Sequence, residues 1–178
     1  MTWTAFHNRG ETLRSVIATA AVRRDGILPM DVPGVAERFH DELDLLGALQ
    51  LKWRTRLAGH IESELSVQPM DLESAVTAGW ARTAEQLPGV RMILDHYRAH
   101  PTDDAMAQAV VRSTSKEHHY LAAMAGLAGV GKEEGQQVGA AIEERARTTV
   151  PGIPAIDRVE DDAPRLPFME RLRAIVAA

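Results

Sequence analysis

The chain has 178 residues, of which 45% are hydrophobic and 4% aromatic, and its formal net charge is −5 at pH 7. It contains no cysteine, which excludes disulfides, thiolate catalysis and cysteine-ligated zinc or iron–sulfur clusters. Acidic and basic residues are interspersed, whereas nucleic-acid-binding proteins usually carry a basic stripe, so we expect no nucleic-acid partner. The length fits one domain with a substantial core.

The apolar runs indicate the expected compartment. Residues 1–14 include Asn, Arg, Gly and Glu and lack the continuous apolar region of a signal peptide. No run reaches the ~20 apolar residues that a membrane-spanning helix needs. We therefore expect a cytoplasmic protein that does not enter a membrane.

The spacing of apolar residues predicts helices throughout the chain and no strand. Asp25-Gly26, Gln68-Pro69, Pro88-Gly89, His100-Pro101 and the glycine-rich stretch 126–131 mark the expected breaks. The predicted helices cover residues 5–24, 35–65, 72–87, 90–99, 104–128 and 132–148. The low aromatic content also suits helices better than sheets.

The longest predicted helix, residues 35–65, organises the expected fold. Its apolar side chains at helical spacing form one face that other helices must cover: Phe39, Leu43, Leu46, Trp53, Leu57, Ile61 and Leu65. We expect Phe39, Leu46, Trp53, Leu57 and Ile61 to be buried. Short connections then predict an all-α, up-down helical bundle built around this helix, with one domain over residues 1–148.

Polar residues lie on the same face of this helix. Gln50 and Arg54 fall among its apolar positions, and Glu117 falls on the apolar side of the helix predicted at 104–128. A buried arginine needs a carboxylate partner, so we expect Arg54 to be shielded and paired with Glu117 first or Glu64 second. Gln50, Arg54 and Glu117 would then form either a ligand pocket or a polar layer that fixes helix register.

Histidine spacing suggests an alternative, a metal site. His60 and Glu64 are four residues apart, as are His96 and His100, so each pair shares one helix face. In this order the two pairs resemble the middle of a haemerythrin-type di-iron site, a resemblance of four residues. It implies iron bound by His60, Glu64, His96 and His100, with His118 as a further candidate. That family's downstream H-x-x-x-x-D motif is absent.

Three shorter motifs are incomplete. Glu37 and His40 have the E-x-x-H spacing of di-iron bundles, but the chain has no second such pair. His40-Asp41 matches the HD dipeptide of metal-dependent phosphohydrolases. Residues 126–132 read G-x-x-x-x-G-K, but Glu133 replaces the Ser or Thr that binds Mg²⁺ in a phosphate-binding loop.

Composition changes after residue 148. Prolines and acidic residues between 149 and 164 predict a linker, and Pro167 opens a short amphipathic helix. Phe168, Leu172 and Ile175 share one face of it, and so short a helix needs a surface to dock on. That surface could belong to the same chain or to a partner; we expect an intersubunit or partner contact.

Two functions follow from these patterns. The first is a non-enzymatic helical module for protein–protein interaction, an accessory or regulatory protein that self-associates and needs no cofactor. The second is a haemerythrin-like or other di-iron bundle with oxygen or redox chemistry. We favour the first, because each catalytic or metal-binding pattern lacks at least one required residue.

Overall fold

A computed structural model describes residues 3–127 and 132–153, and every regular element among them is helical. The helices α1 to α7 and one π-helical turn, η1, follow the chain in order: α1 Trp3–Arg23, α2 Val35–Arg38, α3 Glu42–Val67, α4 Leu72–Gln86, α5 Pro88–Ala99, α6 Asp104–Ala122, η1 Ala123–Leu127 and α7 Lys132–Thr149. The all-α fold predicted from the sequence is confirmed.

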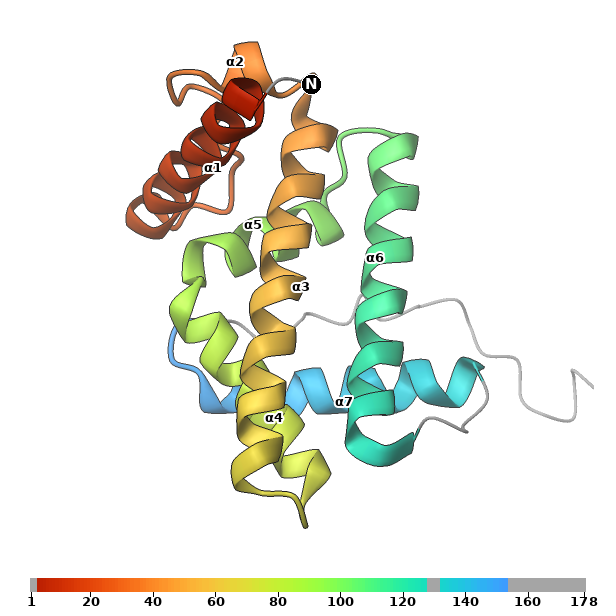
Figure 1. The fold of residues 1–178 in the computed structure, drawn as a ribbon. Helices are drawn as coiled ribbons and strands as arrows, with labels where there is room; N and C mark the ends of the chain where they lie inside the picture. Colours follow the sequence, from red (N-terminus) through yellow and green to blue (C-terminus); the bar gives the residue numbers. More distant parts are fainter. Residues whose placement is uncertain (1–2, 128–131, 154–178) are drawn as a thin grey trace, which may run out of the picture.

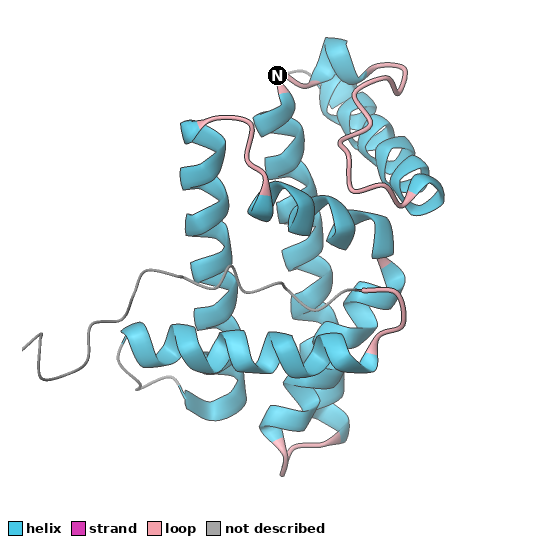
Figure 2. Cartoon of the chain, turned by 180° about the vertical axis from the view of Figure 1, so that it is seen from behind, coloured by secondary structure: helices cyan, strands magenta, loops and turns pink. Residues whose placement is uncertain are grey.

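The helices form a bundle around α3 (Figure 1). Helices α3 and α4 form an antiparallel hairpin, and α6 lies beside them. Helices α5 and α7 run across this axis, and α1 packs at the end of the bundle farthest from the α3–α4 turn. Seen from behind, α7 crosses the lower part of the bundle (Figure 2). No helix in the described part of the chain is long and apolar enough to cross a membrane.

The predicted helix 35–65 is two helices. α2 ends at Arg38, Phe39 is extended, and α3 begins after Asp41. The Asp41 side chain accepts a hydrogen bond from the Asp44 amide at 2.8 Å, which caps α3. The continuous helix predicted from the sequence is therefore wrong over residues 39–41, and α3 itself is about 39 Å long at 1.5 Å per residue.

A tertiary ion pair accompanies this break. Arg9 of α1 donates to both Asp44 oxygens, at 2.7 and 3.2 Å, and also to the carbonyl oxygen of Arg38 at the end of α2. Its guanidinium lies over the Phe39 ring at 4.2 Å. The ion pair with Arg9 holds the pKa of Asp44 below its usual value. Arg9 thus joins α1 to both sides of the break.

The expected core face of α3 is confirmed. Phe39, Leu46, Trp53, Leu57 and Ile61 are all buried. The edge of Trp53 meets Trp80 of α4, with ring centroids 5.5 Å apart. Close packing between the two helices depends on a small residue in α4, because a Cβ at Gly79 would lie 2.8 Å from the Ile61 Cα.

Helix ends follow the sequence signals closely. Asp71 caps α4 and Asp103 caps α6, each accepting a backbone amide three residues ahead. The helix predicted at 104–128 is regular only to Ala122 and then widens into η1. Gly126, inside η1, has a φ of 86°, a left-handed conformation that glycine adopts without strain.

The first residues of the predicted linker belong to the bundle. Thr149 is the last residue of α7, and Val150 and Ile153 are buried in the core. The prediction that residues 149–164 are poorly packed is therefore wrong for 149–153. The remainder of the linker, together with Phe168, Leu172 and Ile175, lies outside the described residues.

Candidate functional site

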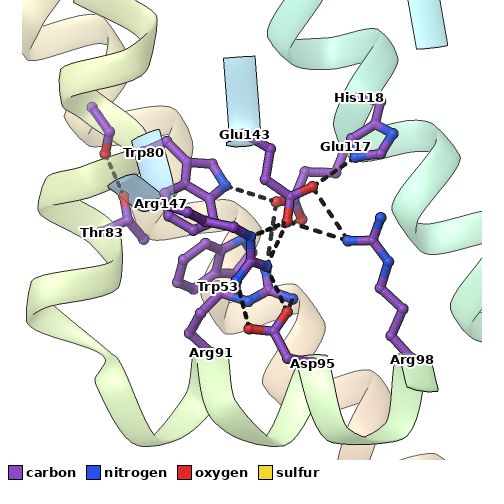
Figure 3. A network of polar contacts seen from close by, with 11 residues as sticks. Trp53, Trp80, Thr83, Arg91, Asp95, Arg98, Glu117, His118, Glu143 and Arg147 are labelled. Carbon is purple, nitrogen blue, oxygen red and sulfur yellow. Dashed lines mark hydrogen bonds and ion pairs between the residues drawn. The ribbon is translucent and has the colours of Figure 1, made fainter. Parts of the chain in front are cut away.

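A buried network of charged and aromatic side chains occupies the centre of the bundle (Figure 3). Five helices contribute to it. Its members are Trp53 of α3; Trp80 of α4; Arg91, Asp95 and Arg98 of α5; Glu117 and His118 of α6; and Glu143 and Arg147 of α7.

Arg147 is the central cation of this network. It is 2% exposed and forms two hydrogen bonds with Asp95, from Nη1 to Oδ2 at 2.9 Å and from Nη2 to Oδ1 at 2.6 Å. It also donates to Glu143, one helical turn earlier in α7, from Nη2 at 2.6 Å. Burial alone would lower the pKa of Arg147, but Asp95 and Glu143 raise it above its usual value. Arg147 therefore joins α7 to α5 through a bidentate ion pair with Asp95.

The Glu143 carboxylate accepts hydrogen bonds from side chains of three helices, α5, α6 and α7. His118 Nε2 lies 2.7 Å from its Oε2, and Arg98 Nη1 lies 3.2 Å from its Oε1. Burial would raise the pKa of Glu143, but the hydrogen bond with His118 and the charges of Arg91, Arg147 and Arg98 hold it well below its usual value. A carboxylate can only accept, so Nε2 of His118 carries the hydrogen. The Nδ1 atom of His118 is buried without a hydrogen-bond partner among the described residues.

The backbones of α6 and α7 meet closely at this point. A Cβ built at Gly139 would overlap the carbonyl of His118, so only glycine permits this approach. The approach brings His118 and Glu143 within hydrogen-bond distance, although they are 25 residues apart in the chain.

Glu117 is held by two tryptophans. Trp53 Nε1 donates to its Oε2 at 3.1 Å and Trp80 Nε1 donates to its Oε1 at 3.2 Å. Arg91 Nη1 lies 3.6 Å from the same carboxylate and donates from Nη2 to Asp95 at 2.8 Å. The prediction that Glu117 lies on the apolar side of its helix is confirmed by its 8% exposure.

The two central guanidinium groups also stack on the indole rings. Arg91 lies 4.8 Å from the Trp53 ring centre, and Arg147 lies 5.1 Å from that of Trp80. Three guanidinium groups face three carboxylates, so the network is neutral when His118 is neutral. Balanced charge and hydrogen bonds to both partners are what make ion pairs tolerable in a protein interior.

The buried arginine beside Glu117 is Arg91, not Arg54 as predicted from the sequence. Arg54 is exposed, so the predicted buried Arg54–Glu117 pair is wrong, and Arg91 takes that place. Gln50, Arg54 and Glu117 nevertheless line one small cavity of about 20 Å³ between α3, α5 and α6. Glu64, the second partner proposed for Arg54, pairs with Arg82 at 3.0 Å.

The candidate metal ligands have separate partners. His60 Nδ1 lies 3.0 Å from Thr83 Oγ1, Glu64 pairs with Arg82, and His118 bonds to Glu143. His96 and His100 do lie together, with ring centres 5.3 Å apart. Within residues 3–127 and 132–153, no three His, Asp or Glu side chains are grouped so that they could hold a metal ion.

Six members of the network were not predicted from the sequence as parts of a buried site: Trp80, Arg91, Asp95, Arg98, Glu143 and Arg147. A signal did exist. Glu143 and Arg147 are four residues apart, and each directly follows an apolar residue that is buried, Ile142 and Ala146. In α5, Arg91, Asp95 and Arg98 repeat at helical spacing beside the apolar face. Spacing of this kind is equally typical of exposed ion pairs, so it does not by itself indicate burial.

The network has the chemistry of a structural element that fixes the crossing of five helices. Its carboxylates already accept hydrogen bonds from guanidinium or indole groups, which leaves little capacity for proton transfer. At its edge, the small cavity between α3, α5 and α6 lies next to Arg91, whose Nε atom is buried without a hydrogen-bond partner among the described residues. No protein-family model matches the chain, and comparisons with curated proteins and with solved structures gave no match.

Proposed function

We propose that this protein is a non-enzymatic helical interaction module that associates with a second copy of itself. The observation that carries the proposal is an exposed apolar tip at the end of the bundle, defined by Val67, Met70, Leu72 and Leu127. Met70 is 96% exposed and Val67 is 74% exposed. Contiguous exposed apolar side chains of this kind are typical of protein–protein contacts.

The residues of the tip come from two segments at one end of the bundle. Val67, Met70 and Leu72 surround the α3–α4 turn, and the end of η1 lies at the same end of the bundle (Figure 1). A Cβ at Gly126 would lie 3.0 Å from Leu72 Cδ1, which places the residue next to Leu127 against α4. Two segments far apart in the sequence thus form the tip.

The charges around the tip favour a basic occupant. Glu62 and Asp71 are exposed on α3 and just before α4, and Glu73, also exposed there, pairs with Arg145 of α7. The segment 165–176 carries Arg165, Arg171 and Arg173 and one acid, Glu170. Its apolar residues Phe168, Leu172 and Ile175 have the spacing of one helix face. Segment 165–176 of one copy therefore complements the tip of another in both charge and polarity.

Each copy carries one tip and one such segment. Two copies can exchange segments reciprocally, which satisfies both sites in a closed dimer. Phe168 follows Ile153 by fifteen residues, a length that reaches at most about 50 Å when extended. This reach exceeds the ~18 Å along α4 from Ala84, beside Ile153, to Leu72 at the tip of the same chain. Linker length therefore permits docking on either copy, and the oligomeric state distinguishes the two.

The test measures oligomeric state over a range of concentrations by analytical ultracentrifugation. Met70→Glu adds a charge to the tip without disturbing the core, and deletion of residues 165–178 removes the proposed occupant. Each change is expected to convert the dimer to a monomer while the circular dichroism spectrum stays helical. Val22→Glu, at an equally exposed apolar residue of α1, is the matched control and should leave the dimer intact.

Two outcomes would overturn the proposal. A full-length chain that stays monomeric at high concentration has no self-association to explain. A truncated chain that loses stability in denaturant without any change in association places the segment on its own bundle, which contradicts the exchange between copies.

A further inference from the structure

Met70 is the only exposed methionine in the described part of the chain. The sequence has seven methionines and no cysteine, so thioethers are its only sulfur groups. The side chain of Met70 is 96% exposed. The other methionines among residues 3–127 and 132–153 are buried or partly buried: Met30, Met92, Met106 and Met124. Of these five thioethers, an oxidant in solution therefore reaches that of Met70 first.

The place of Met70 in the fold allows its polarity to change without loss of the bundle. Met70 lies in the connection between α3 and α4, outside both helices. The backbone amide of Asp71 donates to the Gln68 carbonyl at 3.4 Å, and the Asp71 side chain caps α4. Neither interaction involves the Met70 side chain. Oxidation at this position should therefore leave the helices intact and change only the surface of the tip.

The chemistry of the thioether supplies that change. A peroxide transfers one oxygen atom to the Met70 sulfur: an S–O bond forms as the O–O bond breaks. The sulfur is oxidised by two electrons, and hydrogen peroxide is reduced to water. The product, methionine sulfoxide, is polar and can be reduced again by an enzyme. Its neighbours in the tip, Val67 and Leu72, offer its oxygen no side-chain donor.

We propose that reversible oxidation of Met70 by a peroxide controls self-association through the apolar tip. This inference rests on the self-association proposed above. The reduced tip accepts the apolar face of segment 165–176, whereas the sulfoxide must give up bound water when that face docks. The contact also covers Met70, so oxidation takes place on the dissociated chain and holds it in that form.

The test combines peptide mass spectrometry with analytical ultracentrifugation of the full-length chain. Dilute protein is treated with hydrogen peroxide, and the dimer dissociation constant is measured before and after treatment. We expect Met70 to gain an oxygen atom before the four more buried methionines, and the dissociation constant to rise by about tenfold or more. A methionine sulfoxide reductase should restore the original constant. Oxidation of Met70 should also slow as protein concentration rises, because the dimer covers it.

Variants identify the sulfur that is responsible. Each variant is compared with itself before and after peroxide, so its own affinity does not enter the comparison. Met70→Leu has no sulfur at the tip, and its dissociation constant should not respond to peroxide. Met169 lies in the proposed docking segment, so Met169→Leu is the matched control and should respond as the unchanged protein does. Met70→Gln carries a polar group without any oxidant and should weaken the dimer by about tenfold or more.

Three results overturn the inference, and they are distinguishable from one another. A dimer that persists with Met70 fully oxidised contradicts control by oxidation but leaves the self-association standing. Dissociation by peroxide that is equally strong in Met70→Leu places the sensitive group elsewhere. A chain that is monomeric before any peroxide is added contradicts the self-association itself, and the control by Met70 with it.

Discussion

The α3–α4 interface and the α5–α7 junction are both buried, but different interactions hold them together. At the α3–α4 interface, Gly79 lets the backbones approach, and Trp53 and Ile61 pack directly against α4. At the α5–α7 junction, long side chains of Arg147 and Arg98 join the helices through Asp95 and Glu143. The first interface depends on shape and the second on complete pairing of charges, so the two should respond differently to mutation.

The largest effect is expected at the charged junction. Arg147→Ala leaves the buried Glu143 and the partly buried Asp95 without their main cation, and should lower the free energy of unfolding by about 3–5 kcal/mol. Arg145→Ala is the matched control. Arg145 lies two residues before Arg147 on α7 and forms an exposed ion pair with Glu73 of α4. An exposed pair contributes about 0–1 kcal/mol. Urea unfolding of both variants measures the difference, and equal losses would contradict the distinction.

A loss of similar size is expected when the large side chain of the α3–α4 interface is removed. Trp53→Ala creates a cavity in the core and leaves Glu117 with one indole donor fewer. The free energy of unfolding should fall by about 3–5 kcal/mol. Chemical denaturation checks this value, and a loss below about 1 kcal/mol would show that Trp53 is not a core residue.

A smaller effect is expected from one added methyl group at the same interface. Gly79→Ala forces α3 and α4 apart at Ile61 and should cost about 1–3 kcal/mol. Gly47→Ala, where a Cβ meets no atom within 4 Å, should instead stabilise α3 by about 0.5–1 kcal/mol. Thermal unfolding of both variants gives the comparison. Stabilisation by Gly79→Ala would mean that the helices are not closely packed.

The smallest effect on stability is expected from the titration of His60, whose ring hydrogen-bonds to Thr83 at the edge of the α3–α4 interface. Burial, followed by the charges of Arg82 and Arg56, lowers the pKa of His60 from its ordinary value of 6.5. The unfolded chain therefore binds the proton first as pH falls, so the stability contributed by His60 is complete above about pH 7 and is lost as pH falls below that ordinary value. An NMR titration of the His60 ring measures the pKa directly.

The lowered pKa of His60 should also be visible in the pH dependence of the free energy of unfolding. Between pH 7 and pH 5 the unchanged protein should lose slightly more stability than His60→Gln, which has no proton to gain at this position. A His60 ring that titrates above 6.5 would contradict the predicted direction.

The break between α2 and α3 shows where sequence patterns are ambiguous. Residues 35–46 contain no proline, and the apolar spacing continues through Phe39 and Leu43, so the pattern predicts a continuous helix. The capping sequence Asp41 to Asp44 was present, but acidic residues are also common inside helices. Arg9, more than thirty residues upstream, joins both sides of the break by binding Asp44 and the Arg38 carbonyl.

The sequence by itself determined the helical class and the buried face containing Trp53 and Ile61, because these depend on local spacing and on backbone hydrogen bonds within one helix. Only the tertiary structure decided that Arg91 rather than Arg54 is buried. Both arginines lie near apolar positions of their helices, and a long side chain next to such a position can turn inward or outward. The direction depends on where carboxylates lie: Glu117 of α6 and Asp95, one turn further along α5, contact Arg91, whereas Arg54 is exposed beside the cavity.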